Sequence, residues 1–561
     1  MINNDPAKLT RNEGLKSSHP HLAGNIAQTL ANPELNSFTQ DDYEFLKFHG
    51  VYQQDDRDKR KVGKQFIFMV RTKFPGGTLN AQQYLACDHL ASTYANNTLR
   101  ITTRQDFQFH GVIKSNLRNT IKELNDTLIT TIAACGDVNR NVMAPPTPST
   151  SPLVDEILEH ARKLSDSLNP ATEAYHKIWL EGQELKLETP EQKEFVDPLY
   201  GKSYLPRKFK VAFAIPPLND IDVFTNDVGF VAIIEGGKIL GYNLLVGGGM
   251  GMSHGNAETF PRLADVIGFL PPEKLEAAAK AVLTIHRDFG DRTNRKHARL
   301  KYVLEEKGAK WCRLEIEKRA GFVLEEARPF KFTKQGDVLG WQQQSNGNYF
   351  LGLFVENGRI KDADGYNLKS GLREVLKQFP VEVRLTASQN LLLVNVKDEQ
   401  RSGIEKILSE HGVSTADQFS AVRLASMACP ALPTCGLSLA ESERALPGII
   451  TRFEKLLEEV GLNNEEIVIR MTGCPNGCAR PYMAEIGFVG KAPGKYQVYV
   501  GGNESSTRLN KLYKEALKID ELETELRPVL KRFVQERAQG ERFGDWSARV
   551  LWQETGVPAA N

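Results

Sequence analysis

The chain has 561 residues, 41% of them hydrophobic and 25% charged, and its formal net charge is +1. That length is too great for one hydrophobic core, so three or four domain-sized units are expected. The composition excludes a fibrous or disordered chain, and the balanced charge gives no overall field that would attract nucleic acid. No secretory signal and no run of eighteen apolar residues occurs, so no membrane span is expected. The seven cysteines are few and odd in number, which argues against a disulfide framework, and the expected compartment is the cytoplasm.

Residues 1–64 are polar and mixed in pattern, and we predict an N-terminal arm that is weakly structured or wrapped around the body. At residue 65 the pattern changes. Residues 66–74 predict a strand, residues 80–95 a helix, residues 99–112 strand again and residues 115–134 a second helix. Together, residues 65–143 predict a ferredoxin-like half-domain. A linker, "APPTPSTSP" at 144–152, separates it from a larger mixed unit at 153–328.

The chain then repeats itself. Residues 99–112, "LRITTRQDFQFHGV", resemble residues 383–396, "VRLTASQNLLLVNV", and the segment beginning at Asp227 resembles the one beginning at Glu485. Because both similarities occur in the same order, we predict a second ferredoxin-like half-domain at 329–412 and a second larger α/β domain at 413–561. The predicted fold class is α+β with a duplicated, pseudo-twofold architecture, and a large ligand would fit between the halves.

Four of the seven cysteines lie within one window of fifty residues: Cys429, Cys435, Cys474 and Cys478. Zinc sites favour cysteine pairs separated by two residues, whereas five and three residues intervene here. Iron–sulfur clusters accept more varied spacings, and the Pro-Asn-Gly turn at 475–477 would let the backbone approach a cluster closely. Spacing alone leaves a cluster, zinc and ordinary packing open. We interpret the other three cysteines as core residues: Cys87, Cys135 and Cys312.

Two predicted strands carry basic residues on one face. In "LPRKFKVAF", alternation places Lys208 and Lys210 opposite an apolar face. In residues 99–112, one parity holds Arg100, Thr102 and Arg104, joined by Gln108 and His110 if the turn preserves the register. The opposite parity is apolar and predicts a core face: Leu99, Ile101, Phe107 and Phe109. A solvated sheet edge is the plain alternative, but basic strands of this kind would suit a polyanionic ligand.

These motifs together resemble those of the sirohaem-containing sulfite and nitrite reductases. "ACPALPTC" with "TGCPNGCAR" is similar to the cluster-binding motif of that family, and "FHGVYQQDDRD", "TTRQDFQFHG", "NRN", "LPRKFK" and "GYNLLVGGG" match in the right order. The resemblance covers nearly the whole chain and is greatest to haemoprotein subunits of assimilatory, NADPH-dependent sulfite reductases. It implies two ferredoxin-like half-domains and two larger domains that hold sirohaem and one 4Fe-4S cluster.

The resemblance also implies a role for three groups of residues. The cysteines of the window, Cys429, Cys435, Cys474 and Cys478, would ligate the 4Fe-4S cluster, and Cys478 would also be the axial ligand of the sirohaem iron. Sirohaem carries many carboxylates, whose burial needs paired cations. The residues implied to hold sirohaem are Arg100, Arg104, Gln108, His110, Arg207, Arg299 and Asn476. Those implied to bind the substrate anion and favour its protonation are Arg71, Arg140, Lys208 and Lys210.

Two positions depart from the family pattern. Arg299 stands where the closest relatives have lysine, so the charge is kept and the geometry changes. Ala479 follows the last cysteine where glycine is frequent, and alanine would be strained there only if that position requires a positive φ.

The implied reaction is the six-electron reduction of sulfite to sulfide for cysteine biosynthesis, with reduction of nitrite to ammonia as the alternative. Lys210 favours sulfite, because nitrite-reducing members look like "PRKWN" and a singly charged anion needs less positive charge. No convincing GxGxxG fingerprint occurs, and we interpret the glycines of "LLVGGGMGMSHG" as close backbone packing.

Electrons are therefore expected from another protein. By resemblance this is an NADPH-dependent flavoprotein subunit, with ferredoxin as the alternative donor, and the polar arm is a candidate docking element. Two hypotheses from other classes remain: a zinc-stabilised binding module and a polyanion-binding protein without redox chemistry.

Overall fold

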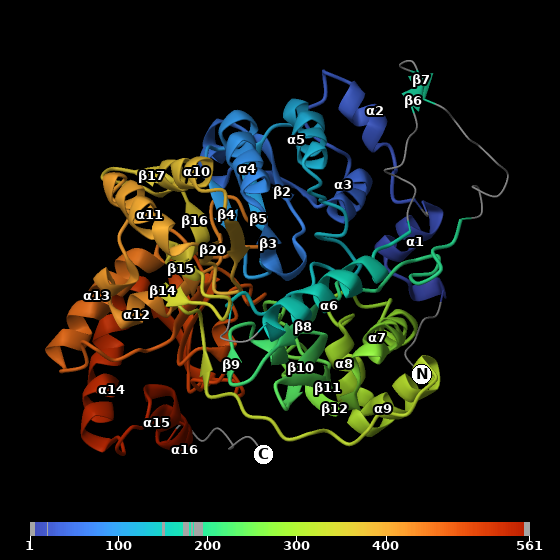
Figure 1. Ribbon diagram of the computed structural model, residues 1–561. Coiled ribbons are helices and arrows are strands. Elements are labelled where there is room, and N and C mark those ends of the chain that lie inside the picture. Colours follow the sequence, from blue (N-terminus) through green and yellow to red (C-terminus); the bar gives the residue numbers. More distant parts are fainter. Residues whose placement is uncertain are drawn as a thin grey trace.

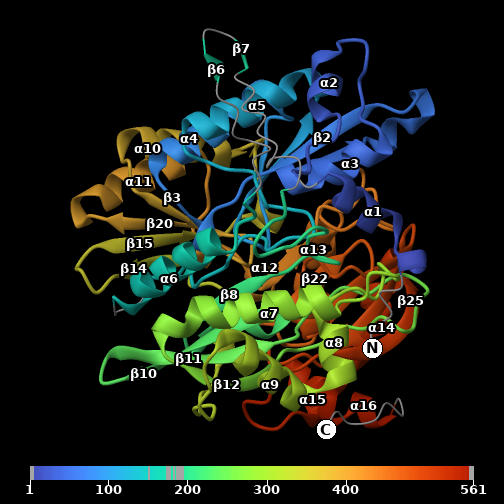
Figure 2. The same ribbon diagram turned by 90° about the vertical axis from the view of Figure 1, so that its right-hand side faces the viewer.

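The computed structural model describes residues 6–19, 21–148, 152–171, 179–180, 183–184 and 195–554. The chain forms four units. In chain order these are a smaller unit (blue), a larger unit (green), a second smaller unit (yellow-orange) and a second larger unit (red), and the two smaller units lie side by side and pack against the two larger ones (Figures 1 and 2). Within the described part of the chain, no helix is both long and apolar enough to cross a membrane.

The first smaller unit is a five-stranded sheet in the order β1-β2-β5-β4-β16. Four of its strands come from the first part of the chain: β1 (Val51–Asp55), β2 (Phe66–Arg71), β4 (Leu99–Ile101) and β5 (Phe107–Val112). The apolar face packs against α4 (Ala81–Tyr94) and α5 (Lys114–Asp126). Helix α4 begins at a capping box, in which the side chains of Asn80 and Gln83 each accept a backbone N–H of the other.

The N-terminal arm is more structured than its sequence suggested. It contains α1 (Arg11–Ser18), α2 (Ile26–Ala31) and α3 (Gln40–Leu46), and a later part of it forms β1, which pairs antiparallel with Phe66–Val70 of β2. The strand went unrecognised because "VYQQD" lacks apolar alternation: only its first and last residues are buried. The first half-domain therefore begins before residue 65, the predicted boundary.

The second smaller unit repeats the first. Its sheet has the order β14-β15-β20-β19-β3, built from β14 (Gly340–Gln343), β15 (Tyr349–Leu353), β19 (Glu382–Leu385) and β20 (Leu391–Val396), with α10 (Leu368–Gln378) and α11 (Asp398–Glu410). The two units exchange one short strand each. β3 (Thr78–Leu79) pairs with β19, and β16 (Arg359–Ile360) pairs with β4. This reciprocal exchange crosses the predicted domain boundaries.

The first sequence similarity is confirmed at the level of the turns. Gln105 joins β4 to β5 and Gln389 joins β19 to β20, each with a positive φ (56° and 73°). In both turns a threonine hydroxyl accepts the backbone N–H four residues on, from Asp106 to Thr102 and from Asn390 to Thr386. Positions 284 residues apart are thus structurally equivalent here.

The larger units share a second pattern. In the first, β8 (Val211–Ala214) is parallel to β10 (Val228–Glu235), which continues antiparallel through β11 (Lys238–Val246) and β12 (Asp265–Leu270). In the second, β22 (Ile469–Thr472) is parallel to β23 (Ile486–Ala492), followed by β24 (Lys495–Val500) and β25 (Lys511–Lys518). The N–H of Val228 donates to Lys210 O and that of Ile486 to Val468 O, both at 3.0 Å. Positions 258 residues apart are therefore equivalent in these units.

Each larger unit has one further parallel segment. β21 (Ser426–Ala428) lies beside β22, and residues 139–143, predicted to belong to the first half-domain, bridge in the same way to Phe209 and Ala212.

The remaining helices are α6 (Leu153–Ser167), α7 (Leu275–Phe289), α8 (Leu300–Lys307), α9 (Ala309–Ala320), α12 (Ala421–Leu424), α13 (Leu446–Glu459), α14 (Leu522–Glu536), α15 (Phe543–Arg549) and α16 (Leu551–Glu554). Minor two-stranded pairs are β6 (Trp179–Leu180) with β7 (Gln183–Glu184), β9 (Leu218–Asn219) with β13 (Lys334–Gln335), and β17 (Asp362–Ala363) with β18 (Tyr366–Asn367).

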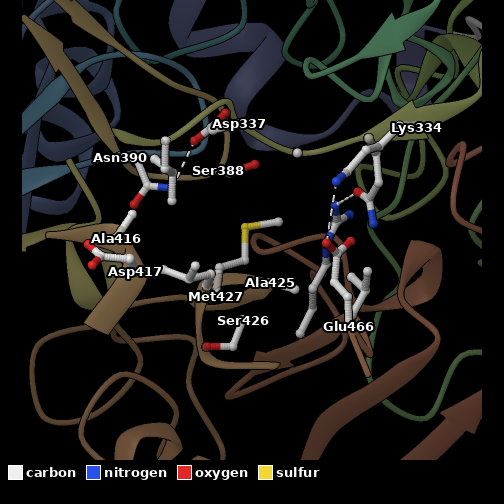
Figure 3. Close-up of a pocket in the computed structure, with 16 residues that line it drawn as sticks. Lys334, Asp337, Ser388, Asn390, Ala416, Asp417, Ala425, Ser426, Met427 and Glu466 are labelled. Carbon is white, nitrogen blue, oxygen red and sulfur yellow. Dashed lines mark hydrogen bonds and ion pairs between the residues drawn. The ribbon is translucent and has the colours of Figure 1, made fainter. Parts of the chain in front are cut away.

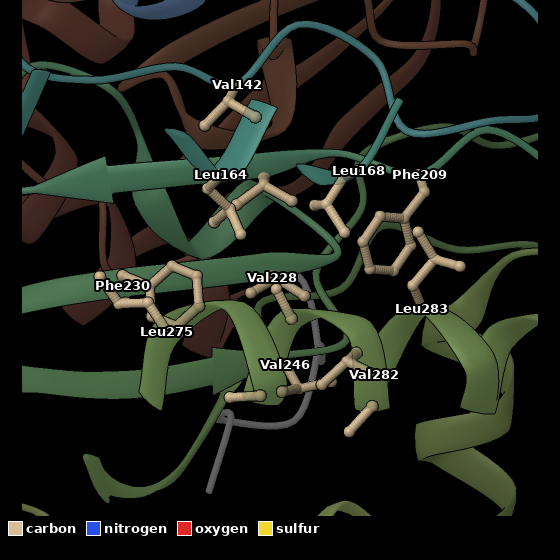
Figure 4. Packing of buried hydrophobic residues seen from close by; sticks show 14 of the residues in the cluster. Val142, Leu164, Leu168, Phe209, Val228, Phe230, Val246, Leu275, Val282 and Leu283 are labelled. Atoms are coloured by element: carbon tan, nitrogen blue, oxygen red, sulfur yellow. The ribbon is translucent and has the colours of Figure 1, made fainter. Parts of the chain in front are cut away.

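A continuous apolar core supports the first larger unit. From helix α7, the side chains of Leu275, Val282 and Leu283 pack against strand residues such as Phe230 and Val246 (Figure 4). Burying each large apolar side chain contributes about 1.5–3 kcal/mol. This packing fixes the segment before β8, in which Phe209 is fully buried, and so fixes where its neighbouring lysines lie.

Candidate active site

A row of polar and basic side chains crosses the first sheet. Arg71 on β2 is the register partner of Gln108 on β5, Gln108 of Arg100 on β4, and Arg100 of Arg359 on β16. The apolar residues of opposite parity are fully buried in the core: Leu99, Ile101, Phe107 and Phe109. The turn thus preserves the register, as the predicted face requires. The Gln108 amide satisfies both neighbours when its oxygen accepts from Arg71 Nε (3.2 Å) and its nitrogen donates to His110 Nε2 (3.3 Å).

A second group of cations comes from the segments beside β8. Arg140 N donates to Phe209 O (3.0 Å), which places Arg140 next to the half-buried Lys208 and Lys210. Burial first, and then neighbouring cations that include Arg140 and Arg299, hold the pKa of both lysines well below the ordinary value. Cations without matching carboxylates form a site for an anion.

Other arginines near this group are anchored by the protein itself. Arg104 donates to Asn226 Oδ1 (2.6 Å) and to Val211 O (2.8 Å). Arg299 donates from Nη2 to both carboxylate oxygens of Asp227, at 3.0 and 2.9 Å. Arg299 therefore forms a buried ion pair with Asp227.

The sequence did not predict the environment of Arg100. Its Nε lies 3.1 Å from Glu443 Oε2, and Arg359 binds both oxygens of the same carboxylate. Burial raises the pKa of Glu443, but Arg100 and Arg359 outweigh it and hold the value at about 2. Burial also lowers the pKa of His110 well below its usual value. No spacing in the sequence connects Glu443 and Arg359 to the basic strand, because both come from the second half of the chain.

The four cysteines of the window lie in two loops that are bonded together. Cys429 N donates to Met471 O (3.2 Å), and Gly473 N to Cys429 Sγ (3.4 Å). Burial and then neighbouring thiols raise the pKa of Cys429, Cys435 and Cys474 to about 12. Cys478 is exposed, whereas Cys429 and Cys474 are buried. Arg100 Nη2 donates to Ala428 O (2.8 Å), next to Cys429, and Thr103 Oγ1 donates to Cys478 O (2.9 Å), so the basic strand contacts the loops that carry the thiols.

The residues next to Cys478 suit the backbone conformations that they adopt. Gly477 has φ +61°, and a Cβ there would lie 2.9 Å from the Tyr482 ring. Ala479 is not among the residues with positive φ, although Arg480 is (52°), so alanine is unstrained. The glycine-rich segment after β11 packs closely, as interpreted: a Cβ on Gly248 would lie 2.1 Å from Phe224 O.

The remaining predicted residues lie at the rim or in the core. Arg207 has a side chain 31% exposed and is 4.0 Å from Asp137. Asn476 donates to Cys474 Sγ (3.6 Å). The three other cysteines are fully buried, in agreement with a packing role: Cys87, Cys135 and Cys312.

The second half contains a cavity at the equivalent place. It has a volume of about 370 Å³ and is lined by residues that include Glu466, Met427 and Asp337 (Figure 3). By the structural equivalences, its residues Glu466 and Val468 take the places of Lys208 and Lys210. The basic group therefore exists in one half only.

Comparisons with known proteins agree with this architecture. A model described as the nitrite and sulphite reductase 4Fe-4S domain matches residues 159–324, and one described as the nitrite/sulfite reductase ferredoxin-like half domain matches residues 59–127 and 342–411. The NADPH sulfite reductase hemoprotein beta-component of Staphylococcus saprophyticus is 47% identical over 549 residues, 97% of this chain and 96% of that protein. The chain belongs to the nitrite and sulfite reductase family. The protein of the same name from Myxococcus xanthus is 48% identical over 555 residues, 98% of each chain.

The family resemblance and the duplicated α+β fold are thus confirmed. The structure of Mycobacterium tuberculosis NirA has the same fold, with a TM-score of 0.80 at 24% identity, covering 99% of this chain and 98% of that one. The matched 4Fe-4S model lies on the first larger unit, which lacks the clustered cysteines. Those thiols belong to the structurally equivalent second unit.

The residues present fit the 4Fe-4S centre of the family. A cubane of this kind takes four thiolates, and the four thiols of the window act on one another electrostatically. Among the described residues, no three His, Cys, Asp or Glu side chains converge on a single ion. Raised thiol pKa values mean that a metal centre would displace protons when it binds.

Proposed function

We propose that this protein reduces sulfite to sulfide by six electrons, at a sirohaem joined to a 4Fe-4S cluster through Cys478, in the assimilation of sulfate into cysteine. The proposal is supported by a group of cations that have no ion-paired carboxylate among the described residues, Arg140, Lys208 and Lys210, and by the window of four thiols that includes the exposed Cys478. When bound, the two cofactors would supply electrons singly to the sulfur of the substrate.

The protein's own groups would hold the anion and supply protons. Arg71 and Arg140 are suited to bind sulfite oxygens, because arginine stays charged and donates through a planar fork. Lys208 and Lys210, with lowered pKa values, are suited to give protons as each oxygen leaves as water. Arg100, Arg104, Arg207 and Arg299 are proposed to face the sirohaem carboxylates, with Gln108, His110 and Asn476.

Sulfite is favoured over nitrite by the lysine pair. The more highly charged anion compensates two adjacent cations better than nitrite does, and Arg104, Arg299 and Arg140 add to the positive charge that lowers the pKa of Lys210. The test is oxidation of a reduced dye by the reconstituted protein, with sulfite and nitrite as separate acceptors. A higher kcat/KM for sulfite, with sulfide as product, supports the proposal. A preference for nitrite would overturn the substrate assignment but not the family.

The proposed electron donor is an NADPH-dependent flavoprotein subunit, with ferredoxin as the alternative. The named relatives are NADPH enzymes, which supports the first donor. Residues 58–64 of the arm are exposed, and Arg57 Nη1 donates to Ser438 O (2.6 Å) beside the loop that carries Cys435. Activity with each reduced protein, normalised to activity with the dye, distinguishes the donors. Stimulation by ferredoxin alone would overturn the flavoprotein assignment.

A further inference from the structure

Arg480 joins two equivalent positions of the duplicated fold. It lies two residues after Cys478, is buried, and has φ 52°. Its Nε donates to Asp222 Oδ2. Asp222 lies 258 residues earlier, has φ 51°, and precedes the short helix η6 (Val223–Thr225) as Arg480 precedes η10 (Pro481–Met483). A contact between equivalent residues lies on the pseudo-twofold axis.

The same guanidinium also reaches both half-domains. Nη1 donates to Thr103 O (3.4 Å) and Nη2 to Ala387 O (2.9 Å). These two carbonyls are 284 residues apart and occupy equivalent places in the turns of the two half-domains. One side chain of the second larger unit therefore contacts each of the other three units.

Only the first turn is bonded directly to the cysteine. Thr103 Oγ1 donates to Cys478 O at 2.9 Å. The second turn has Ala387 at the equivalent position, which carries no hydroxyl. Thr103, which both Arg480 and Cys478 contact, lies between Arg100 and Arg104, two of the proposed sirohaem partners.

We propose that Arg480 is a positioning residue that fixes Cys478 against the turn carrying Arg100 and Arg104. This inference rests on the proposed function, because it concerns the thiolate that would join the two metal centres. It assigns Arg480 a role beyond stability: holding the shared sulfur at a set place relative to the carboxylate-binding arginines.

Arg470 provides a matched control within the same ion-pair network. Its Nη1 donates to Asp222 Oδ2 (2.7 Å), and it is equally buried. Its other partners are Gln335 and, weakly, Arg480 O. R470M therefore removes a buried cation from the same carboxylate but leaves the contacts to the turns and to Cys478.

The experiment compares R480M, R470M and T103V as reconstituted holoenzymes. For each we would measure Tm, iron and sirohaem content, the EPR and visible spectra, the midpoint potential of the haem, and kcat with a reduced dye. We expect R480M and R470M to lower Tm alike. R480M alone should change the spectra and the potential, with a loss of about tenfold to a hundredfold in kcat. R480K should restore part of the signature.

T103V keeps the test decisive if R480M does not fold, because it leaves the ion pair in place and should show a smaller spectral change of the same sign. Equal spectral changes in R470M and R480M, or unchanged spectra in both R480M and T103V, would overturn the inference. The proposed function fails separately, if wild-type protein with normal spectra prefers nitrite.

Discussion

The two larger units differ in the residues just before an equivalent strand. Lys208 and Lys210 precede β8 in the first unit, and Glu466 and Val468 precede β22 in the second. The backbones match, down to the hydrogen bonds from Val228 and Ile486. The thiols show the reverse distribution. At positions equivalent to Cys429, Cys474 and Cys478, the first half has Pro145, Pro216 and Asp220.

The difference shows how a duplicated fold acquires one site rather than two. The basic group comes from the first copy and the clustered thiols from the second, so neither copy alone holds both. An anionic ligand beside thiolates needs cations in the same cleft, because uncompensated buried charge is strongly destabilising. The residues that line the second cavity include none of the clustered thiols and none of Arg140, Lys208 and Lys210 (Figure 3). Four substitutions test this division, in order of decreasing expected effect.

The largest effect is expected from C474S. Removing one of four thiol ligands should prevent cluster assembly, lower iron and labile sulfide content, and reduce turnover roughly a thousandfold or more, because cooperating groups fail together. The matched control is C312A, since Cys312 is buried in the first copy and far from any proposed ligand role. Full iron content in C474S, or its loss in C312A, would contradict the assignment of the cluster to the second copy.

K208M should have the next largest effect. Losing one preorganised cation typically costs about 10²–10³ in rate, and we expect kcat/KM for sulfite to fall by that factor while cofactor content is unchanged. K334M is the control, because Lys334 lines the equivalent cavity in the second half. Similar losses in both variants would mean that the two cavities are not chemically distinct.

The pH dependence of KM for sulfite should report the titration of the lysines. The pKa of Lys210 lies well below its ordinary value, first through burial and then through neighbouring cations. The empty site therefore loses its proton as pH rises through that lowered pKa. Anion binding favours the protonated form, so KM for sulfite should rise with pH, by up to about tenfold per unit for each lysine reprotonated.

K210R is the control for that pH profile. Arginine keeps its charge throughout, and the titration of sulfite itself is common to both proteins, so the variant should show a flatter rise in KM. Parallel profiles for wild type and K210R would exclude Lys210 as the titrating group.

Local patterns predicted the parts of the site that lie within one element. Alternation across residues 99–112 correctly separated Arg100 and Gln108 from the core, because side chains in a strand alternate strictly between faces. The repeat correctly indicated the duplicated fold. Contacts that join distant segments left no such pattern. β16 is only two residues long, and the partnership of Arg359 and Glu443 exists only after the half-domains exchange strands.

The smallest effect is expected from E466Q, at the position equivalent to Lys208. Glu466 pairs with Lys334 at 3.4 Å, with side chains 32% and 54% exposed. Exposed pairs of this kind contribute about 0–1 kcal/mol, so Tm should change by less than about 3 °C. The KM for sulfite should be unchanged, because Glu466 faces a cavity that has neither thiols nor the basic group. A severalfold change in that KM would show that the second cavity is coupled to the first, and that the duplication has retained more than its backbone.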